Sequence, residues 1–114
     1  MTKKERELIY SKFNGHCAYC GCHLEYKDMQ VDHIVSKCYH NGEDTISNYY
    51  PSCRQCNFYK STYSIEQFRH NLESVIWNKL KDSFNYRLLV KYGQIVEHKT
   101  PIKFYFEVCE GKTE

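Results

Sequence analysis

The chain has 114 residues, which predicts one domain with a small hydrophobic core. Sixteen basic and fourteen acidic side chains leave a net charge of +2, so charge alone neither identifies nor excludes a nucleic-acid-binding protein. The first ten residues, MTKKERELIY, contain no apolar run, and no segment approaches the roughly 18–20 apolar residues of a transmembrane helix. We therefore expect a cytoplasmic protein without a signal peptide.

A helix over about residues 3–13 is the first predicted element. Thr2 and Glu5 have the spacing of a capping box, in which each side chain binds the backbone amide of the other residue. The Asn-Gly pair at 14–15 is a typical C-terminal signal, because both residue types tolerate a left-handed backbone. This capped helix precedes a cysteine-rich turn, HCAYCGC, at residues 16–22.

Residues 23–35, HLEYKDMQVDHIV, predict an antiparallel hairpin that turns at Lys27 and Asp28. Neighbours on a regular strand point to opposite faces, so Asp32 and His33 can share a site only where the strand ends or bends. The polar, turn-like run at 36–47 predicts such an end. The two-residue period of the second strand places four side chains on one face: Met29, Val31, His33 and Val35.

The second half of the chain predicts three helices and a final strand. Residues 53–61, CRQCNFYKS, look like a turn entering a short helix, and Ser64 with Gln67 could cap a longer helix. Another helix over about 84–92 is expected to end at a glycine, and the apolar alternation over 102–108 predicts a half-buried strand. The expected fold class is α+β: a small centre flanked by the N-terminal helix and by C-terminal helices plus a strand. The apolar stripe of the longer helix is formed by Ile65, Phe68, Leu72, Ile76 and Leu80.

Seven cysteines in a cytosolic chain indicate metal binding or redox chemistry rather than a disulfide framework. Two C-x-x-C pairs, Cys17 with Cys20 and Cys53 with Cys56, have the usual spacing of a closed tetrahedral zinc site. A disulfide or simply buried thiols are the alternative, and Cys22 could compete with Cys20 as a ligand. Structural zinc contributes an apparent 10–16 kcal/mol, roughly the whole stability of a domain, about 5–15 kcal/mol, so we expect the fold to depend on Zn²⁺.

Residues between and just after the cysteine pairs suit a second, reactive metal. Asp32 offers a hard oxygen for Mg²⁺ or Mn²⁺, and Asn57 offers an amide oxygen as a second ligand. His33 carries an imidazole, which can take a proton from water. A cation held by so few protein oxygens keeps waters and binds substrate phosphates, which is the layout of a metal-assisted phosphodiesterase.

Three stretches resemble the HNH nuclease family, in its zinc-knuckle branch with a ββα-metal core: GHCAYCG at 15–21, VDHIV at 31–35 and NYYPSCRQCNFYKS at 48–61. The resemblance covers about residues 13–62. It implies the hairpin near 23–35 and a helix near 54–62 around one divalent cation, within a single nuclease domain whose residues 63–114 form an extension.

The position of each residue in the motif implies its role. His33 resembles the general base, Asp32 the acidic metal ligand, and Asn48 the residue that orders the loop and the histidine. Asn57 stands where the final histidine of the family usually lies, so the chain resembles an H-N-N version with oxygen ligands, as in the HNH domain of RNA-guided nucleases. Lys60, one turn later, resembles the basic residue near the scissile phosphate, and a solvated helix charge is its alternative.

The resemblance implies a metal-dependent endonuclease that hydrolyses DNA, with structural Zn²⁺ and catalytic Mg²⁺ or Mn²⁺, in the cytoplasm of a bacterial or phage-infected cell. A DNA- or protein-binding module that does not cleave is the main alternative, because the aromatic residues of 62–114 lie outside the motif. A zinc-thiolate redox switch is a third possibility, which rests only on spare cysteines. A homodimer or a larger assembly is possible. The sequence does not specify the target sequence, or whether one strand or both strands are cut.

Overall fold

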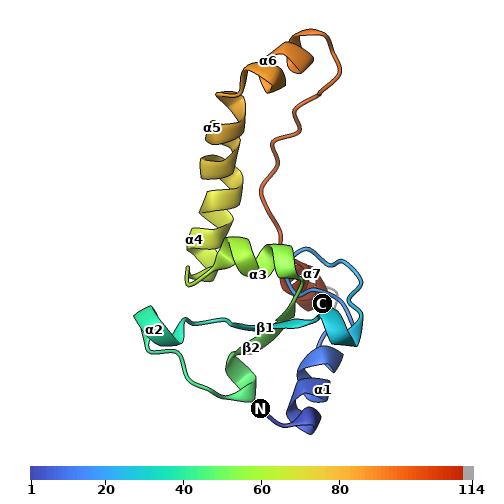
Figure 1. The fold of residues 1–114 in the computed structure, drawn as a ribbon, viewed down its shortest axis with the longest axis vertical. Helices are drawn as coiled ribbons and strands as arrows, with labels where there is room; N and C mark the ends of the chain where they lie inside the picture. The colour runs from blue at the N-terminus through green and yellow to red at the C-terminus, as the bar shows by residue number, and fades with distance from the viewer. Residues whose placement is uncertain (112–114) are drawn as a thin grey trace. The chain divides into compact units, whose positions relative to one another are not determined.

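The structure, a computed structural model, describes residues 1–111, which form two compact units. Unit 1 comprises residues 1–65 and 103–111, and unit 2 comprises residues 66–102. Figure 1 shows the elements of both units. Those of the N-terminal part are α1 (Lys3–Ser11), η1 (Tyr26–Asp28), β1 (Gln30–His33), α2 (Lys37–His40), η2 (Ile46–Asn48), β2 (Tyr49–Ser52) and α3 (Arg54–Lys60). The remainder are α4 (Ile65–His70), η3 (Asn71–Val75), α5 (Ile76–Lys81), α6 (Phe84–Lys91) and α7 (Tyr105–Gly111).

The N-terminal helix α1 forms as the sequence predicts. The Thr2 hydroxyl accepts a hydrogen bond from the Glu5 amide, and the backbone turns left-handed at Asn14 and Gly15, with φ of 52° and 78°. Arg6 donates to the carbonyls of Tyr26 and Met29, at 3.0 and 2.8 Å. Helix α1 therefore fastens the segment that leads into the first strand.

The sheet consists of two antiparallel strands, β1 and β2, followed directly by α3 (Figure 1). In its register, Asp32 pairs with Tyr50 and His33 pairs with Tyr49. The ββα unit is as expected, but the predicted hairpin over 23–35 is wrong, because β1 pairs with residues 49–52. The reason is that side chains of α1 and the turn η1 bind the backbone groups of 24–29 that a hairpin would need.

The buried side chain of β1 is Asp32, whereas Val31 and His33 are half-buried. Val35, predicted on the apolar face, is 45% exposed. The strand ends at His33 and is followed by a bend, which meets the condition for adjacent residues to serve one site. The face of β1 that carries the carboxylate is thus the one turned inward.

The C-terminal segment corrects a second prediction. Residues 105–111 form helix α7, so the expected strand over 102–108 is wrong. The amides of Tyr105 and Phe106 donate to the carbonyls of Tyr19 and Ala18, at 2.9 and 2.8 Å. Glu107 accepts from the amide of Phe104, which is 2% exposed. A short apolar run fits either period, and here docking on the first cysteine turn selects the helix.

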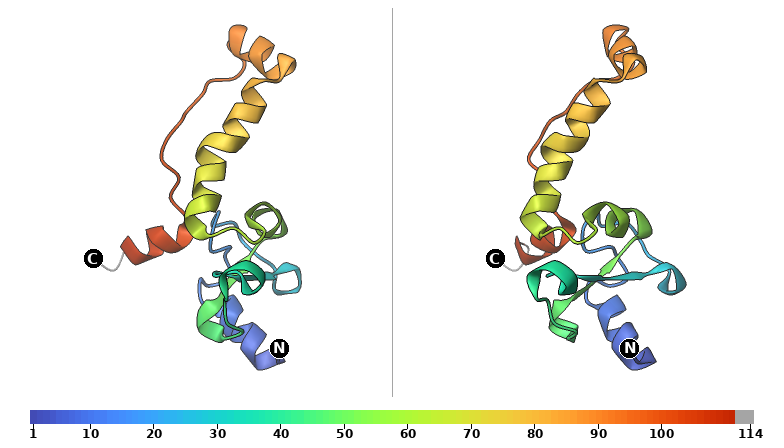
Figure 2. Two further views of the ribbon diagram at one scale, coloured as in Figure 1. Left: turned by 90° about the vertical axis from the view of Figure 1, so that its left-hand side faces the viewer. Right: turned by 60° about the vertical axis from the view of Figure 1, so that its left-hand side comes forward.

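Unit 2 is built from the predicted helices. The run from α4 through η3 to α5 is one continuous helix in both views of Figure 2, with a π-helical stretch in its middle. Helix α6 is capped by Ser83, whose hydroxyl accepts from the Tyr86 amide, and the backbone turns left-handed at Gly93. Of the predicted stripe, Phe68 is buried but Ile76 and Leu80 are 37% and 45% exposed.

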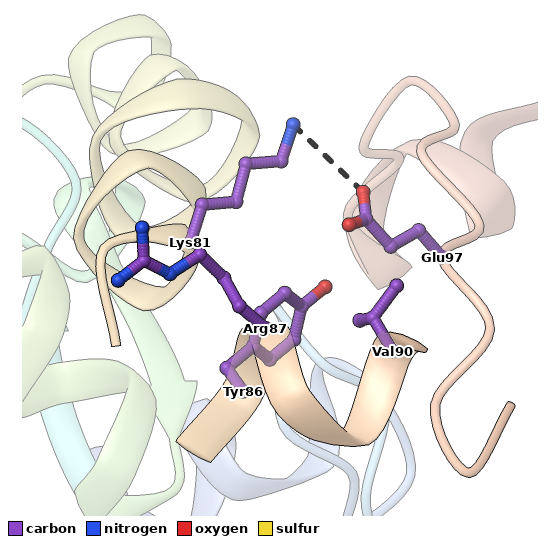
Figure 3. Close-up of a pocket in the computed structure, with 5 residues that line it drawn as sticks. All are labelled: Lys81, Tyr86, Arg87, Val90 and Glu97. Carbon is purple, nitrogen blue, oxygen red and sulfur yellow. Dashed lines mark ion pairs between the residues drawn. The ribbon is translucent and has the colours of Figure 1, made fainter. Parts of the chain in front are cut away.

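A pocket of about 280 Å³ lies beside α6 in unit 2 (Figure 3). Lys81 and Glu97 form an ion pair of 3.8 Å at its edge. Its lining residues are Lys81, Tyr86, Arg87, Val90 and Glu97. Within residues 1–111, no helix combines the length and the apolar character needed to cross a bilayer.

Candidate active site and cysteine cluster

The two C-x-x-C pairs converge in unit 1. Atoms Sγ of Cys17, Cys20, Cys53 and Cys56 all lie within 4.8 Å of one another, and those of Cys20 and Cys53 are 3.8 Å apart. A tetrahedral zinc ion with bonds of about 2.3 Å requires neighbouring sulfurs about 3.8 Å apart. The geometry therefore fits an ion such as zinc. Cys22 is exposed and does not belong to this set of four.

The acid-base properties of the cluster also fit a cation. A hydrogen bond from Cys56 is the main cause that lowers the pKa of Cys17 to about 4, against the effect of burial. The same bond, together with burial, raises the pKa of Cys56, and burial raises that of Cys20. The Cys17 sulfur thus carries a negative charge easily, whereas those of Cys20 and Cys56 resist ionisation. A divalent ion relieves this resistance, since it binds the thiolate form.

Backbone amides in both cysteine turns donate hydrogen bonds to cysteine sulfurs. The Tyr19 amide donates to Cys17 Sγ at 3.4 Å, and in the second turn the Cys56 amide donates to Cys53 Sγ at the same distance. Gly21 has φ of 79°, and a Cβ there would lie 2.8 Å from the ring of Tyr105. Glycine is therefore required both by the turn and by the packing of α7.

Asp32 of β1 forms a buried ion pair with Lys60 of α3. Its Oδ2 is 3.1 Å from Lys60 Nζ and accepts a hydrogen bond of 2.5 Å from the Tyr19 hydroxyl. Lys60, which is 0% exposed, also donates to the His33 carbonyl at 2.9 Å. Burial raises the pKa of Asp32, and the Tyr19 hydrogen bond and the Lys60 ammonium act against that rise. The alternative that Lys60 is a solvated helix charge is therefore excluded.

His33 presents its ring at the end of β1, with its side chain 33% exposed. Its Nε2 lies 2.8 Å from Asp44 Oδ1, and its ring meets that of Tyr49 edge-on at 5.0 Å. A hydrogen bond from Lys37 and then one from His33 lower the pKa of Asp44 to about 2. Because an ionised carboxylate can only accept, Nε2 donates its proton, which leaves Nδ1 as the basic nitrogen.

Asn48 holds the loop that follows β1. Its Oδ1 accepts from the Val35 amide at 2.9 Å, and its Nδ2 donates to the carbonyls of Val35 and Glu43, at 3.0 and 2.9 Å. These three bonds close the loop over 35–43 and fix the residue before Asp44. Gly42 allows this closure, because a Cβ there would lie 1.8 Å from the Val35 carbonyl oxygen.

Asn57 is half-buried on α3, between the cysteine cluster and Lys60 in the sequence. Its backbone amide donates to the Cys53 carbonyl. Within residues 1–111, its side chain forms no hydrogen bond with Asp32. A carboxylate offers about four lone-pair sites. Among the described residues, Asp32 Oδ1 has one polar contact, 3.4 Å to Lys60, and so keeps capacity for a cation. Carboxylate and amide oxygens are the donors that Mg²⁺ or Mn²⁺ prefers.

Two residues of this site were missed by sequence reasoning. Tyr19 lies in the first cysteine turn, where it reads as an ordinary aromatic spacer. Asp44 lies in the polar loop, where an acidic residue is normally solvated. A search for acidic residues near the predicted base would have found Asp44. No local pattern signals the contact between Tyr19 and Asp32.

Comparison with known proteins agrees with this geometry. Residues 17–62 match the model of the family described as HNH endonuclease. This segment carries both cysteine pairs, the ββα unit and the residues described above. The family resemblance expected from the sequence is therefore confirmed.

Particular relatives point the same way. A protein of Bacillus subtilis (strain 168), named "SPbeta prophage-derived putative HNH endonuclease YoqL", is 31% identical over 88 residues, with 64% of this chain and 36% of that protein covered. The crystal structure of the Type II-C Cas9 enzyme from Actinomyces naeslundii superposes with a TM-score of 0.54 and 25% identity. That match covers 60% of this chain and 8% of Cas9. The chain spans about a third of the bacterial relative, and these matches support a nuclease-type role.

Proposed function

We propose that the protein is a metal-dependent endonuclease that hydrolyses phosphodiester bonds of DNA, with His33 as the general base. The observation that carries the proposal is the pairing of His33 Nε2 with the Asp44 carboxylate, beside the buried Asp32 of the family motif. A carboxylate partner orients the imidazole and stabilises the cation that forms when it takes a proton.

The base acts through Nδ1. Asp44 holds the Nε2 proton, Tyr49 supports one side of the ring, and Asn48 closes the loop that carries Asp44. The imidazole is thereby fixed before substrate arrives. Nδ1 then accepts a proton from an attacking water, an effect worth about 10²–10⁴ in rate.

We propose that Asp32 and Asn57 hold the catalytic divalent cation, Mg²⁺ or Mn²⁺. When bound, such an ion neutralises the charge that develops on the phosphate and the leaving oxygen. Lys60 was expected beside the scissile phosphate, whereas its ammonium here binds Asp32 and the His33 carbonyl. We therefore propose that Lys60 acts by holding these two residues in a fixed relation.

The cysteine cluster is proposed to hold structural Zn²⁺. The cluster joins the first cysteine turn, which contains Tyr19, to the N-terminus of α3, where Cys53 caps the helix. The bacterial relative is named as prophage-derived, which favours action in the cytoplasm of a bacterial or phage-infected cell.

A plasmid-nicking assay tests the proposal. His33→Ala is expected to lower cleavage of supercoiled DNA in Mg²⁺ or Mn²⁺ by about 10²–10⁴, with the fold and zinc content retained. The cleavage rate of Asp44→Asn is expected to lie between those of His33→Ala and the parent. His23→Ala is the matched control, because His23 is an exposed histidine paired with Glu25 outside the site. If His33→Ala cuts as fast as the parent, the assignment is wrong.

A second candidate is a binding module that does not cleave. It is favoured by the exposed aromatic rings of unit 2, since Phe84 and Tyr92 are 69% and 72% exposed. Salt-sensitive DNA binding, with intact DNA in every divalent ion tested, would support this candidate over cleavage.

A further inference from the structure

The hydroxyl of Tyr19 connects the first cysteine turn to the carboxylate proposed to bind the catalytic cation. It donates a hydrogen bond of 2.5 Å to Asp32 Oδ2. Both side chains are buried, at 2% and 4% exposure. A hydrogen bond from a neutral donor to a buried carboxylate is charge-assisted, and it restricts the rotation of the acceptor group.

Tyr19 cannot move independently of the cysteine cluster. It lies between ligand candidates Cys17 and Cys20, its amide donates to Cys17 Sγ, and its carbonyl accepts from the Tyr105 amide at 2.9 Å. Its ring lies edge-on to those of Tyr50 and Phe104, with centroids 6.0 and 5.5 Å away. The phenol is thus held at both its backbone and its ring, and its hydroxyl has a fixed position.

The two oxygens of Asp32 are consequently unequal. Oδ2 receives the 2.5 Å bond from Tyr19 and the 3.1 Å contact from Lys60. Among residues 1–111, the one polar contact of Oδ1 is that of 3.4 Å to Lys60. The better-bonded oxygen anchors the carboxylate. The other oxygen keeps lone pairs for a ligand.

We propose that Tyr19 is a positioning residue that fixes Asp32 with Oδ1 directed to the catalytic cation, so that the cysteine turn sets the geometry of the cation site. The inference rests on the proposed function, because it requires Asp32 to be a ligand. Residues that hydrogen-bond metal-ligating carboxylates typically change metal affinity by about 10–100-fold when mutated.

Tyr19→Phe removes one oxygen and leaves the ring. In the zinc-loaded full chain, Mn²⁺ binding is measured by the loss of the free-ion electron paramagnetic resonance signal. We expect the substitution to weaken this binding about 10–100-fold. Zinc content is expected to stay at the parent level. In cleavage assays, the Mn²⁺ concentration for half-maximal rate should rise by a similar factor, while kcat at saturating Mn²⁺ changes much less. Tyr50→Phe is the matched control, because it removes a hydroxyl from a neighbouring ring that does not bind Asp32.

Asp32→Asn separates the two levels of inference. If the parent binds no Mn²⁺, or Asp32→Asn binds it as the parent does, the proposed cation site is wrong and the role of Tyr19 is wrong with it. If Asp32→Asn loses binding while Tyr19→Phe binds within about twofold of the parent, only the Tyr19 inference is wrong.

A measurement on the parent covers the case in which Tyr19→Phe fails to fold. The Tyr19 hydroxyl proton is buried and hydrogen-bonded, so we expect a slowly exchanging downfield proton resonance. It should move upfield in Asp32→Asn, because a neutral amide oxygen is a weaker acceptor than a carboxylate. This resonance should persist at saturating Mg²⁺. Its loss on Mg²⁺ addition would show that Asp32 leaves Tyr19 when it takes the cation, and would overturn the inference.

Discussion

Replacing Lys60 with methionine is expected to destabilise the protein strongly, because the change leaves the buried carboxylate of Asp32 without its ammonium partner. Lys60 is 0% and Asp32 is 4% exposed, so solvent compensates for only a small part of the lost ammonium. Removal of one partner from a buried ion pair costs about 3–5 kcal/mol. Methionine has a similar length, so little of this loss arises from packing.

Urea denaturation of the zinc-loaded protein measures this loss. With an m-value of about 2 kcal/mol per M, the unfolding midpoint should fall by about 1.5–2.5 M. Lys37→Met is the matched control, because Lys37 is also paired with a carboxylate but its side chain is 62% exposed. It should change the midpoint little, since exposed pairs contribute little to stability. The double variant Asp32→Asn with Lys60→Met should recover part of the loss, because it removes the stranded charge.

The loss of stability in Lys60→Met, called the deficit below, should depend on pH through the pKa of Asp32. Burial already raises this pKa in the folded protein, and loss of Lys60 removes one of the groups that oppose the rise. An acid whose folded pKa exceeds its unfolded value binds protons more tightly in the folded state, so stability falls as pH rises between the two values. The Lys60→Met deficit should therefore be larger near about pH 7 than near about pH 4.5. A deficit below about 1 kcal/mol, or one that does not change with pH, would refute the buried-pair reasoning.

Two further predictions concern the cysteine cluster and the loop after β1. Cys53→Ser should lose both bound zinc and the cooperative unfolding transition, whereas Cys22→Ser, which lies outside the set of four, should keep both. Zinc analysis combined with circular dichroism measures these effects. Equal zinc content in Cys53→Ser and the parent would contradict the assigned ligands. Asn48→Ala removes three hydrogen bonds, each worth about 0.5–1.5 kcal/mol. Amides of 35–43 should then exchange faster in hydrogen-exchange measurements, whereas Asn78→Ala in α5 should leave them unchanged. Unaltered exchange in Asn48→Ala would show that other contacts hold the loop.

Local patterns in the sequence were sufficient for several parts of the fold. The cap of α1, the end of α6 near Gly93 and the ββα order were all predicted, because caps, glycine turns and short periodic runs depend on nearby residues. The convergence of the two C-x-x-C pairs was also predicted, since their spacing suits one tetrahedral ion.

Other elements were decided by contacts between distant segments. The partner of β1 is residues 49–52 rather than a hairpin strand, because α1 binds the backbone that would have formed the hairpin. Residues 105–111 are helical because their first amides bind carbonyls of the cysteine turn. Each of these segments has a period that permits both outcomes, so sequence alone could not choose.

The sequence by itself determined which chemical groups the protein possesses and their order: four thiols in two pairs, a carboxylate next to an imidazole, and an amide and a lysine on the following helix. Only the tertiary structure decided what surrounds them. Asp32 takes its hydrogen bonds from Tyr19 and Lys60, 13 and 28 residues away, and His33 takes its carboxylate partner from a loop 11 residues away. The physical reason is that a buried charge must find partners in three dimensions, and local periodicity does not specify which partners those are.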